Sequence, residues 1–145
     1  VHDCDIKSIH PVCYNIWNLN DEWEIRANMI ADEIIKSNAD FVVLQEVRYN
    51  IIDEYAYKQM GKDRHRFQID ELKNYFKGNE WQYHYQPAMT YIDRFHTDEG
   101  LAIFSKFPIV EVSHLKLSRD LHDMEDAHQR IILRTVLDTP IGHVQ

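Results

Sequence analysis

The sequence predicts an α/β protein, and three stretches near its start carry this prediction. Residues 10–17 are rich in β-forming side chains, residues 21–37 have the spacing of an amphipathic helix, and residues 41–44 form a continuous apolar run. A run with no polar alternation suits a strand that is covered on both faces, as parallel strands usually are. Two strands joined by a helix are therefore expected to be parallel neighbours in one sheet.

Composition and charge narrow the class of protein. The 145 residues are 44% hydrophobic and 12% aromatic with only four Gly and four Pro, which is typical of one globular domain. The 16 basic and 24 acidic residues give a net charge of −8. This charge opposes a module that holds nucleic acid by neutralising phosphates, although a metal ion could supply positive charge to a nuclease.

Neither end of the chain assigns a compartment. No apolar run approaches the ~20 residues that span a bilayer, and the start has neither an initiator Met nor the pattern of a signal peptide. Cys4 and Cys13 could pair only if the first segment folded back on itself. Cys13 is therefore expected to be a small buried residue.

Residues 21–37 are expected to form a helix whose apolar side chains make one stripe. The stripe is widened by Ile25 and Met29, and its members recur at i, i+4, i+7, i+8 and i+11: Trp23, Ala27, Ile30, Ala31 and Ile34. Asp21 with Glu24 three residues later resembles a capping box. Lys36 in the last turn complements the helix dipole.

Two polar side chains are expected at the same edge of the sheet. Asn15 lies near the end of the first strand, and Glu46 comes just past the apolar run of the second strand. The carboxyl ends of parallel strands share one edge, where open α/β sheets bind their ligands. A carboxylate at that edge suits a hard divalent cation. Either residue alone would more often be structural or solvated.

The middle of the chain alternates helix and strand. Residues 49–61 are expected to form a tyrosine-rich, partly helical connection, and residues 67–76 a second amphipathic helix closed by Gly78. Residues 81–87 alternate aromatic and polar side chains as a half-buried strand does, with His84 in a structural role.

Strands dominate the last third. Residues 91–99 are expected to be a polar loop, residues 101–104 a buried strand, and residues 109–117 a strand that bends or bulges midway. Residues 119–128 hold several Asp and His residues, but their spacings match no compact metal motif and indicate ordinary surface chemistry. Residues 130–145 predict a strand, a turn and the opening of a partner strand. Ending within a hairpin strand leaves backbone groups unpaired, so we expect a truncated domain.

Four segments, in the correct order, resemble the opening motifs of the endonuclease/exonuclease/phosphatase superfamily, which has the deoxyribonuclease I-like fold. They are spread along nearly the whole chain: Cys13–Asn18 (Cys-Tyr-Asn-Ile-Trp-Asn), Ala39–Arg48 (with Leu-Gln-Glu), Glu99–Ile109 (Glu-Gly-Leu-Ala-Ile-Phe-Ser-Lys-Phe-Pro-Ile) and Gln129–Val136. The resemblance implies that residues 1–145 are the N-terminal part of a two-sheet αββα sandwich that lacks its C-terminal half. The third segment is closest in style to the sphingomyelinase-like branch.

The resemblance also implies an activity. Glu46 would bind Mg²⁺, with Mn²⁺ as the alternative cation, and Asn15 would help to hold the metal and phosphate. The parent protein would be a phosphodiesterase or phosphatase that uses metal-assisted attack of water on a lipid, inositide or nucleic-acid phosphoester. The family's downstream histidine, Asp-x-Asn motif and Asp-His pair are absent, and His143 is not assigned to that role. The segment alone is therefore expected to be inactive. An inactive interaction domain of the same fold is the alternative.

Overall fold

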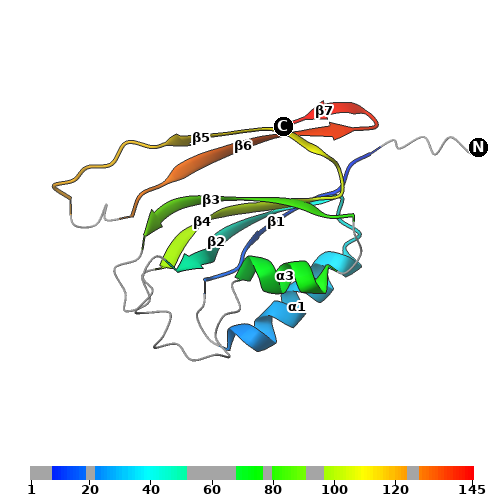
Figure 1. The fold of residues 1–145 in the computed structure, drawn as a ribbon, viewed down its shortest axis with the longest axis horizontal. Helices are drawn as coiled ribbons and strands as arrows, with labels where there is room; N and C mark the ends of the chain where they lie inside the picture. Colours follow the sequence, from blue (N-terminus) through cyan, green and yellow to red (C-terminus); the bar gives the residue numbers. More distant parts are fainter. Residues whose placement is uncertain (1–7, 19–21, 52–67, 77–79, 91–96, 124–127) are drawn as a thin grey trace, which may run out of the picture.

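The structure, a computed structural model, describes residues 8–18, 22–51, 68–76, 80–90, 97–123 and 128–145. Two stacked β-sheets and one layer of helices form three layers (Figure 1). Sheet A has the strand order β1-β2-β4-β3, with bounds Pro11–Asn15, Phe41–Ile51, Thr97–Ser105 and Gln82–Thr90. Sheet B has the order β5-β6-β7, with bounds Ile109–Lys116, Ile131–Thr139 and Gly142–Val144. The helices α1 (Trp23–Lys36) and α3 (Gln68–Tyr75) cover the face of sheet A that points away from sheet B.

The expected parallel unit is present. β1 and β2 pair in parallel, with Asn15 opposite Gln45, and α1 connects them. β2 is much longer than the apolar run at residues 41–44, because it continues past Glu46 to Ile51 as the antiparallel partner of β4. Glu46 therefore lies inside a strand. The sequence had suggested a position just beyond the end of the strand, and this was wrong.

Helix α1 buries the predicted stripe but not its predicted extension. All five members of the stripe are at most 8% exposed and pack into one core with β2 and α3. Ile25 and Met29, in contrast, are 56% and 63% exposed, so the prediction that they widen the stripe is wrong. They lie on the side of the helix that sheet A does not reach.

The start of α1 also differs from the expected capping box. The helix begins at Trp23, and its N-cap is Glu22, which has φ 41° and no side-chain capping bond. The Glu22 carbonyl instead accepts the amide protons of Ile25 and Arg26. Asp21, the expected cap, lies outside the described residues.

Two predicted boundaries in the last third were also wrong. The last three residues of the expected polar loop at residues 91–99 are strand, because β4 begins at Thr97. The bulge in β5 lies between Ile109 and Glu111, at the start of the strand and not midway. The helix α3 and the hairpin β6–β7 lie where the sequence predicts them, and β3 begins as predicted but continues three residues beyond Pro87, to Thr90.

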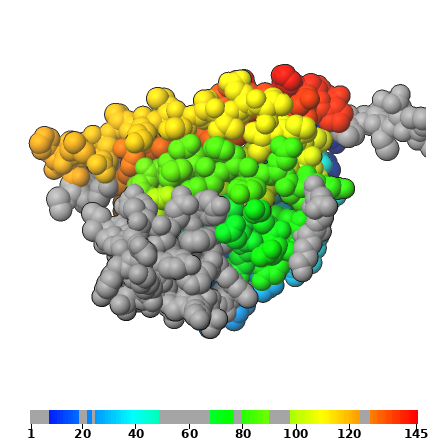
Figure 2. All heavy atoms as spheres, viewed as in Figure 1, coloured from blue at the N-terminus to red at the C-terminus, as the bar shows by residue number. Residues whose placement is uncertain are grey.

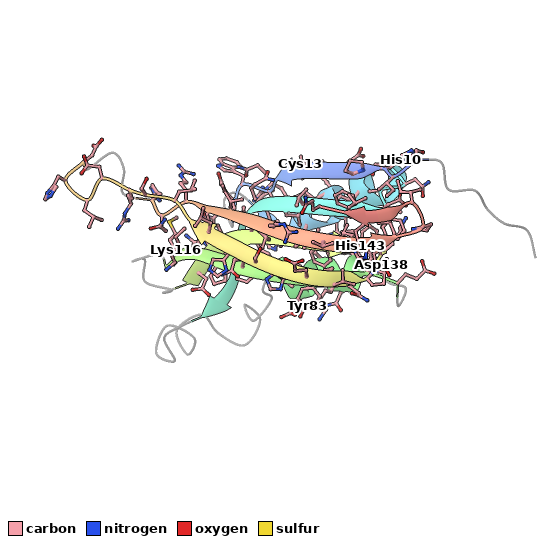
Figure 3. The ribbon with its side chains drawn as sticks, turned by 90° about the horizontal axis from the view of Figure 1, so that it is seen from above. His10, Cys13, Tyr83, Lys116, Asp138 and His143 are labelled. Carbon is pink, nitrogen blue, oxygen red and sulfur yellow. The ribbon has the colours of Figure 1, made fainter. Side chains whose placement is uncertain are left out.

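Cys13 is an exposed free cysteine, which contradicts the expectation of burial. β1 is an edge strand of sheet A, and it lies to one side of sheet B when the two sheets are viewed from above (Figure 3). Sheet B therefore does not cover the face that carries Cys13. Cys4 lies outside the described residues.

The two sheets meet along β3 and β5. Gln82 at the start of β3 accepts the Ile109 amide proton through its Oε1 (3.0 Å), and Ile103 between the sheets is only 1% exposed. Figure 2 shows the strands of sheet B, in yellow to red, lying along β3 in green. In the described part of the chain, no helix has the length and apolar character that crossing a membrane requires.

Candidate active site

A β-bulge aims the Glu46 side chain. Leu44 pairs with Ala102 and Val47 with Gly100, so β2 has one more residue than β4 across this interval. Glu46 takes up the extra residue with φ 57°, a left-handed conformation that is uncommon for a residue other than glycine. Bulges turn side chains out of the regular alternation, and strained backbone of this kind is concentrated at functional sites.

Asn15 and Glu46 are in direct contact. The Nδ2 of Asn15 donates to the Oε1 of Glu46 at 2.9 Å, and its Oδ1 accepts the amide proton of Trp17 at 2.8 Å. The parallel register of β1 and β2 brings the two side chains to one rim, as the order of the elements predicts. The amide thereby orients the carboxylate and leaves its other oxygen for a ligand.

Residues 16–18, which follow Asn15, are held by hydrogen bonds from side chains of both helices. Arg26 on α1 donates to the carbonyl oxygens of Ile16 (2.7 Å) and Asn18 (3.0 Å). The fully buried Gln68 on α3 donates to the same Asn18 carbonyl (2.6 Å) and accepts the Arg48 amide proton (2.7 Å). Because buried polar groups that are satisfied in this way rigidify a structure, the rim is held in one position.

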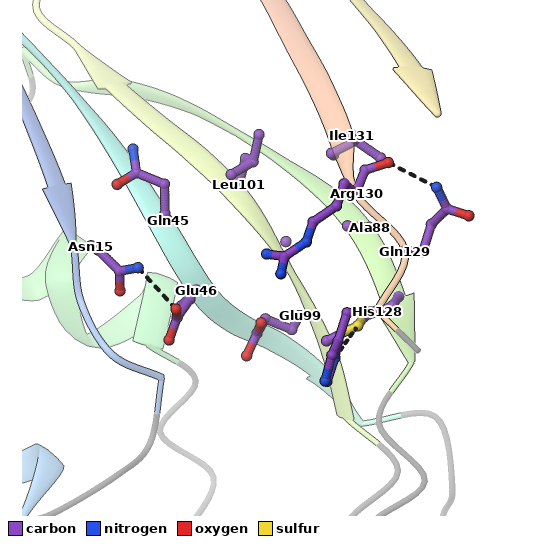
Figure 4. Close-up of a pocket in the computed structure, with 12 residues that line it drawn as sticks. Asn15, Gln45, Glu46, Ala88, Glu99, Leu101, His128, Gln129, Arg130 and Ile131 are labelled. Atoms are coloured by element: carbon purple, nitrogen blue, oxygen red, sulfur yellow. Dashed lines mark hydrogen bonds between the residues drawn. The ribbon is translucent and has the colours of Figure 1, made fainter. Parts of the chain in front are cut away.

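A second carboxylate, Glu99, lies beside the first. Glu99 is on β4 opposite Arg48, and it accepts a hydrogen bond from the Nδ2 of Asn18. Figure 4 shows its carboxylate facing the same space as that of Glu46. From the sequence alone Glu99 was expected in a loop and had no role, because its position depends on the pairing of β4 with β2.

Gly100 allows the backbones to come this close. It lies opposite Val47 across β2 and opposite Pro87 across β3, and a second bulge follows between Pro87 and Met89. A Cβ atom on Gly100 would lie 2.0 Å from the carbonyl oxygen of Gln86, well inside van der Waals contact. Only glycine fits here, so the two bulges depend on this position.

These residues line a cleft of about 410 Å³ between the rim of sheet A and the start of β6. Its walls include Asn15, Gln45, Glu46, Met89, Glu99, His128, Gln129 and Arg130. Figure 4 shows the guanidinium of Arg130 extended into the cleft from the side opposite Asn15. Among the residues that the structure describes, that guanidinium has no hydrogen-bond or ion-pair partner. A cation and two carboxylates thus face one another across the cleft.

Tyr85 does not line the cleft and packs against the core between sheet A and the helices. Burial raises the pKa of the Tyr85 phenol far above its ordinary value of 10.0, and repulsion from Asp98 and Glu99 raises it further. The hydroxyl therefore stays protonated and contacts the Val47 carbonyl oxygen at 3.4 Å.

The side-chain oxygen atoms that line the cleft suit a hard cation that is bound by few protein ligands. Within the described ranges, no group of three or more His, Cys, Asp or Glu residues could form a closed metal cage. Mg²⁺ does not need such a cage, because it keeps several waters and binds one or two carboxylates together with the substrate's phosphate. Glu46 and Glu99 with the Asn15 amide meet that requirement.

His128 and Arg130 were not expected at this cleft from the sequence. His128 was grouped with the surface residues of 119–128, yet it lines the cleft and contacts the Met89 sulfur at 3.4 Å. The sequence places Arg130 only within a segment that resembles the family, with no role of its own. One sequence signal could have indicated that Arg130 lies at the cleft. Arg130 directly precedes an apolar strand, and a side chain at the start of that strand could reach the same rim as Glu46.

Fold and cleft together define a mixed α/β protein with two stacked sheets and an acidic rim. The chain belongs to the endonuclease/exonuclease/phosphatase family, whose model matches residues 12–142. Members of this family are phosphoester hydrolases that generally use divalent metal ions. No curated protein matches the sequence.

Solved structures support the same fold. A family member from Leptotrichia buccalis is 15% identical with a TM-score of 0.61, over 92% of this chain and 51% of its own. One from Beutenbergia cavernae is 17% identical with a TM-score of 0.66, over 93% and 36%. A mannosyl-6-phosphatase from Bacteroides thetaiotaomicron is 19% identical with a TM-score of 0.60, over 90% and 46%. The chain thus spans between about a third and half of these structures, and such identities show the fold alone.

Proposed function

We propose that this chain carries the first part of the active site of a divalent-metal-dependent phosphoester hydrolase, with Mg²⁺ as the cation and Mn²⁺ as its substitute. The observation that carries the proposal is the Asn15–Glu46 contact at a strained bulge, directly across a cleft from the Arg130 guanidinium. A carboxylate oriented by an amide and a guanidinium that extends into the cleft are the groups that a phosphate ester and its cation require.

Each side chain has a role in this proposal. Glu46 would hold the cation, with Glu99 on the same side of the cleft, and the cation would supply Lewis acidity to a phosphoryl oxygen. Asn15 keeps the Glu46 carboxylate in one orientation. Arg130 binds the remaining phosphate oxygens and offsets the charge that they gain during attack by water.

The proposal leaves the substrate at the level of a phosphodiester or phosphomonoester. Lipid, inositide, sugar and nucleic-acid phosphates all present the group that Glu46 and Arg130 would bind. The net charge of −8 disfavours long nucleic acids held mainly by their phosphates. The competing hypothesis is an interaction domain of the same fold in which Asn15 and Glu46 only stabilise the rim.

Glu46→Gln in the full-length protein tests the proposal. Glutamine can still accept the Asn15 hydrogen bond through its Oε1, so the fold should be kept while the charge is lost. We expect hydrolysis of bis(p-nitrophenyl) phosphate with Mg²⁺ to fall by at least about 100-fold, the scale of removing one transition-state-stabilising group. EDTA should abolish the wild-type rate, and added Mg²⁺ or Mn²⁺ should restore it.

The matched control is Glu33→Gln. Glu33 is an exposed carboxylate on α1 that pairs only with Lys36 in the described structure, so its loss should leave the rate unchanged. A wild-type rate in Glu46→Gln would refute the site. A full-length protein that hydrolyses no phosphoester with any divalent cation would instead favour the interaction domain.

A further inference from the structure

Trp17 presents an exposed indole two residues beyond Asn15, which lines the cleft. Its side chain is 52% exposed, although it follows the buried Ile16 and precedes the buried Asn18. Its backbone has φ 53°, a conformation that bulky side chains rarely adopt. Strain of this kind persists only where the surrounding structure imposes it, and it is concentrated at functional sites.

Several contacts fix the position of this indole. The Trp17 amide donates to the Oδ1 of Asn15, so the ring is anchored two residues beyond the Asn15–Glu46 pair. The Arg26 guanidinium lies 5.5 Å from the centre of the Trp17 ring and 5.6 Å from that of Trp23. The carbonyl oxygens of Ile16 and Asn18 hold the same guanidinium in place. Cation–π contact thus supports one face of the Trp17 indole while half of the side chain stays open to solvent.

We propose that Trp17 is a specificity residue that stacks on a planar ring in the organic part of the phosphoester, such as a nucleobase. This inference rests on the proposed function, because it takes the Asn15–Glu46 rim as the phosphate site. A flat aromatic surface that is rigid and open on one face matches another flat ring. It offers neither the concave walls that an acyl chain requires nor the several hydrogen-bond partners that a bare sugar requires.

The charge of the chain supports the same choice. With a net charge of −8, long-range attraction of the phosphate cannot supply much of the affinity. Stacking on an aromatic side chain depends little on charge, and it favours a ligand that carries a ring over one with the phosphate alone. Trp17 would therefore decide which phosphoesters bind, while Glu46 and Arg130 would act on the phosphate that all of them share.

The test compares a phosphate ligand that has a base with one that lacks it. Adenosine 5′-monophosphate and ribose 5-phosphate are titrated into full-length protein with Mg²⁺, and binding is followed by calorimetry and by quenching of tryptophan fluorescence. We expect Trp17→Ala to weaken binding of the nucleotide roughly tenfold and to leave binding of ribose 5-phosphate unchanged. Trp17→Phe should keep most of the nucleotide affinity, because it preserves an aromatic surface.

The matched control is Trp81→Phe, since Trp81 is half-buried and stacks on Phe76 at 5.1 Å. This variant should change neither affinity. The proposal is overturned if Trp17→Ala weakens both ligands equally, if it weakens neither, or if the wild-type protein does not bind the nucleotide. Hydrolysis by Glu46→Gln is measured separately. Failure of the proposed stacking role of Trp17 can therefore be distinguished from failure of the proposed active site.

Discussion

At the scale of single residues, backbone conformation does as much as side-chain chemistry to form the cleft. Trp17, Asn18 and Glu46 all have positive φ, and all three lie at the rim where β1 and β2 meet. Single residues in such conformations cost on the order of 1–3 kcal/mol each. The exposed hydrogen bond from Asn15 to Glu46 and the buried one from Gln68 to the Asn18 carbonyl hold this part of the chain and offset the strain at the rim.

Gly100→Ala is expected to destabilise the protein even though it adds only one methyl group. Its Cβ would overlap the Gln86 carbonyl oxygen at 2.0 Å and the Pro87 Cα at 2.8 Å, and both are backbone atoms that cannot rotate away. Overpacking of this kind costs about 1–3 kcal/mol or more, measurable as a lower midpoint in urea unfolding.

Gly142→Asn is the matched control. Gly142 has φ 109° in the β6–β7 turn, where a side chain strains the backbone, but a Cβ atom added there would meet nothing within 4 Å, so this variant has the strain without the clash. We expect a cost below that of Gly100→Ala. Equal midpoints for wild type and Gly100→Ala would show that β3 can move away from β4 without loss.

The residues of the rim could be predicted only in part from the sequence. Asn15 and Glu46 stand out because each follows an apolar stretch, and a parallel crossover brings such positions together. Glu99 and Arg130 do not stand out, because their places depend on strand pairings between segments about fifty or more residues from Glu46. The prediction that Cys13 is buried failed for a related reason. The exposure of an edge strand such as β1 depends on how far sheet B extends over it.

At the scale of elements, α1 and α3 are joined by a buried polar contact as well as by apolar packing. The Nε1 of Trp23, on the first turn of α1, donates to the Oε2 of Glu71 on α3 at 2.6 Å. Trp23 is 8% exposed and Glu71 is 4% exposed. A hydrogen bond to a buried carboxylate is worth more than one at the surface, because the carboxylate cannot exchange it for water.

Trp23→Phe is therefore expected to cost about 1–3 kcal/mol of unfolding free energy, since it removes a donor from a buried charged acceptor and also reduces the core. Urea unfolding followed by circular dichroism measures this cost. Trp81→Phe, which removes the same indole nitrogen from a half-buried ring, should cost clearly less. If the two variants lost equal stability, the Trp23–Glu71 contact would add nothing beyond packing.

The elements themselves were largely predictable because their patterns are local. The i, i+4, i+7 stripe of α1 is a property of adjacent turns, and its five members are buried as expected. The failures occur where tertiary contacts override the local pattern. Ile25 and Met29 belong to no continuous stripe facing sheet A, and β2 extends to Ile51 only because β4 supplies a partner for its polar half.

At the scale of the whole molecule, the helices cover one face of sheet A, while the outer face of sheet B has no such cover among the described residues (Figure 1). Along β5, every residue after Ile109 is exposed, including those that point to the outer face. Leu115 on β5 and Ile132 on β6 are direct partners across the two strands, and they are 61% and 53% exposed. Neighbouring exposed apolar side chains on a sheet favour association with other molecules.

We therefore expect the 145-residue chain to self-associate as its concentration rises, and we expect the double variant Leu115→Thr and Ile132→Thr to reduce this association. Threonine keeps the β-branched shape that suits a strand while replacing apolar surface with a hydroxyl, so the sheet should be kept. Sedimentation velocity over a wide range of concentration measures the effect. Ile25→Thr, which removes a similarly exposed side chain (56%) from the helix layer, should leave association unchanged. If Ile25→Thr reduced association equally, the contact would not be specific to sheet B. If the wild-type chain stayed monomeric, the exposed pair at Leu115 and Ile132 would be too small to drive association.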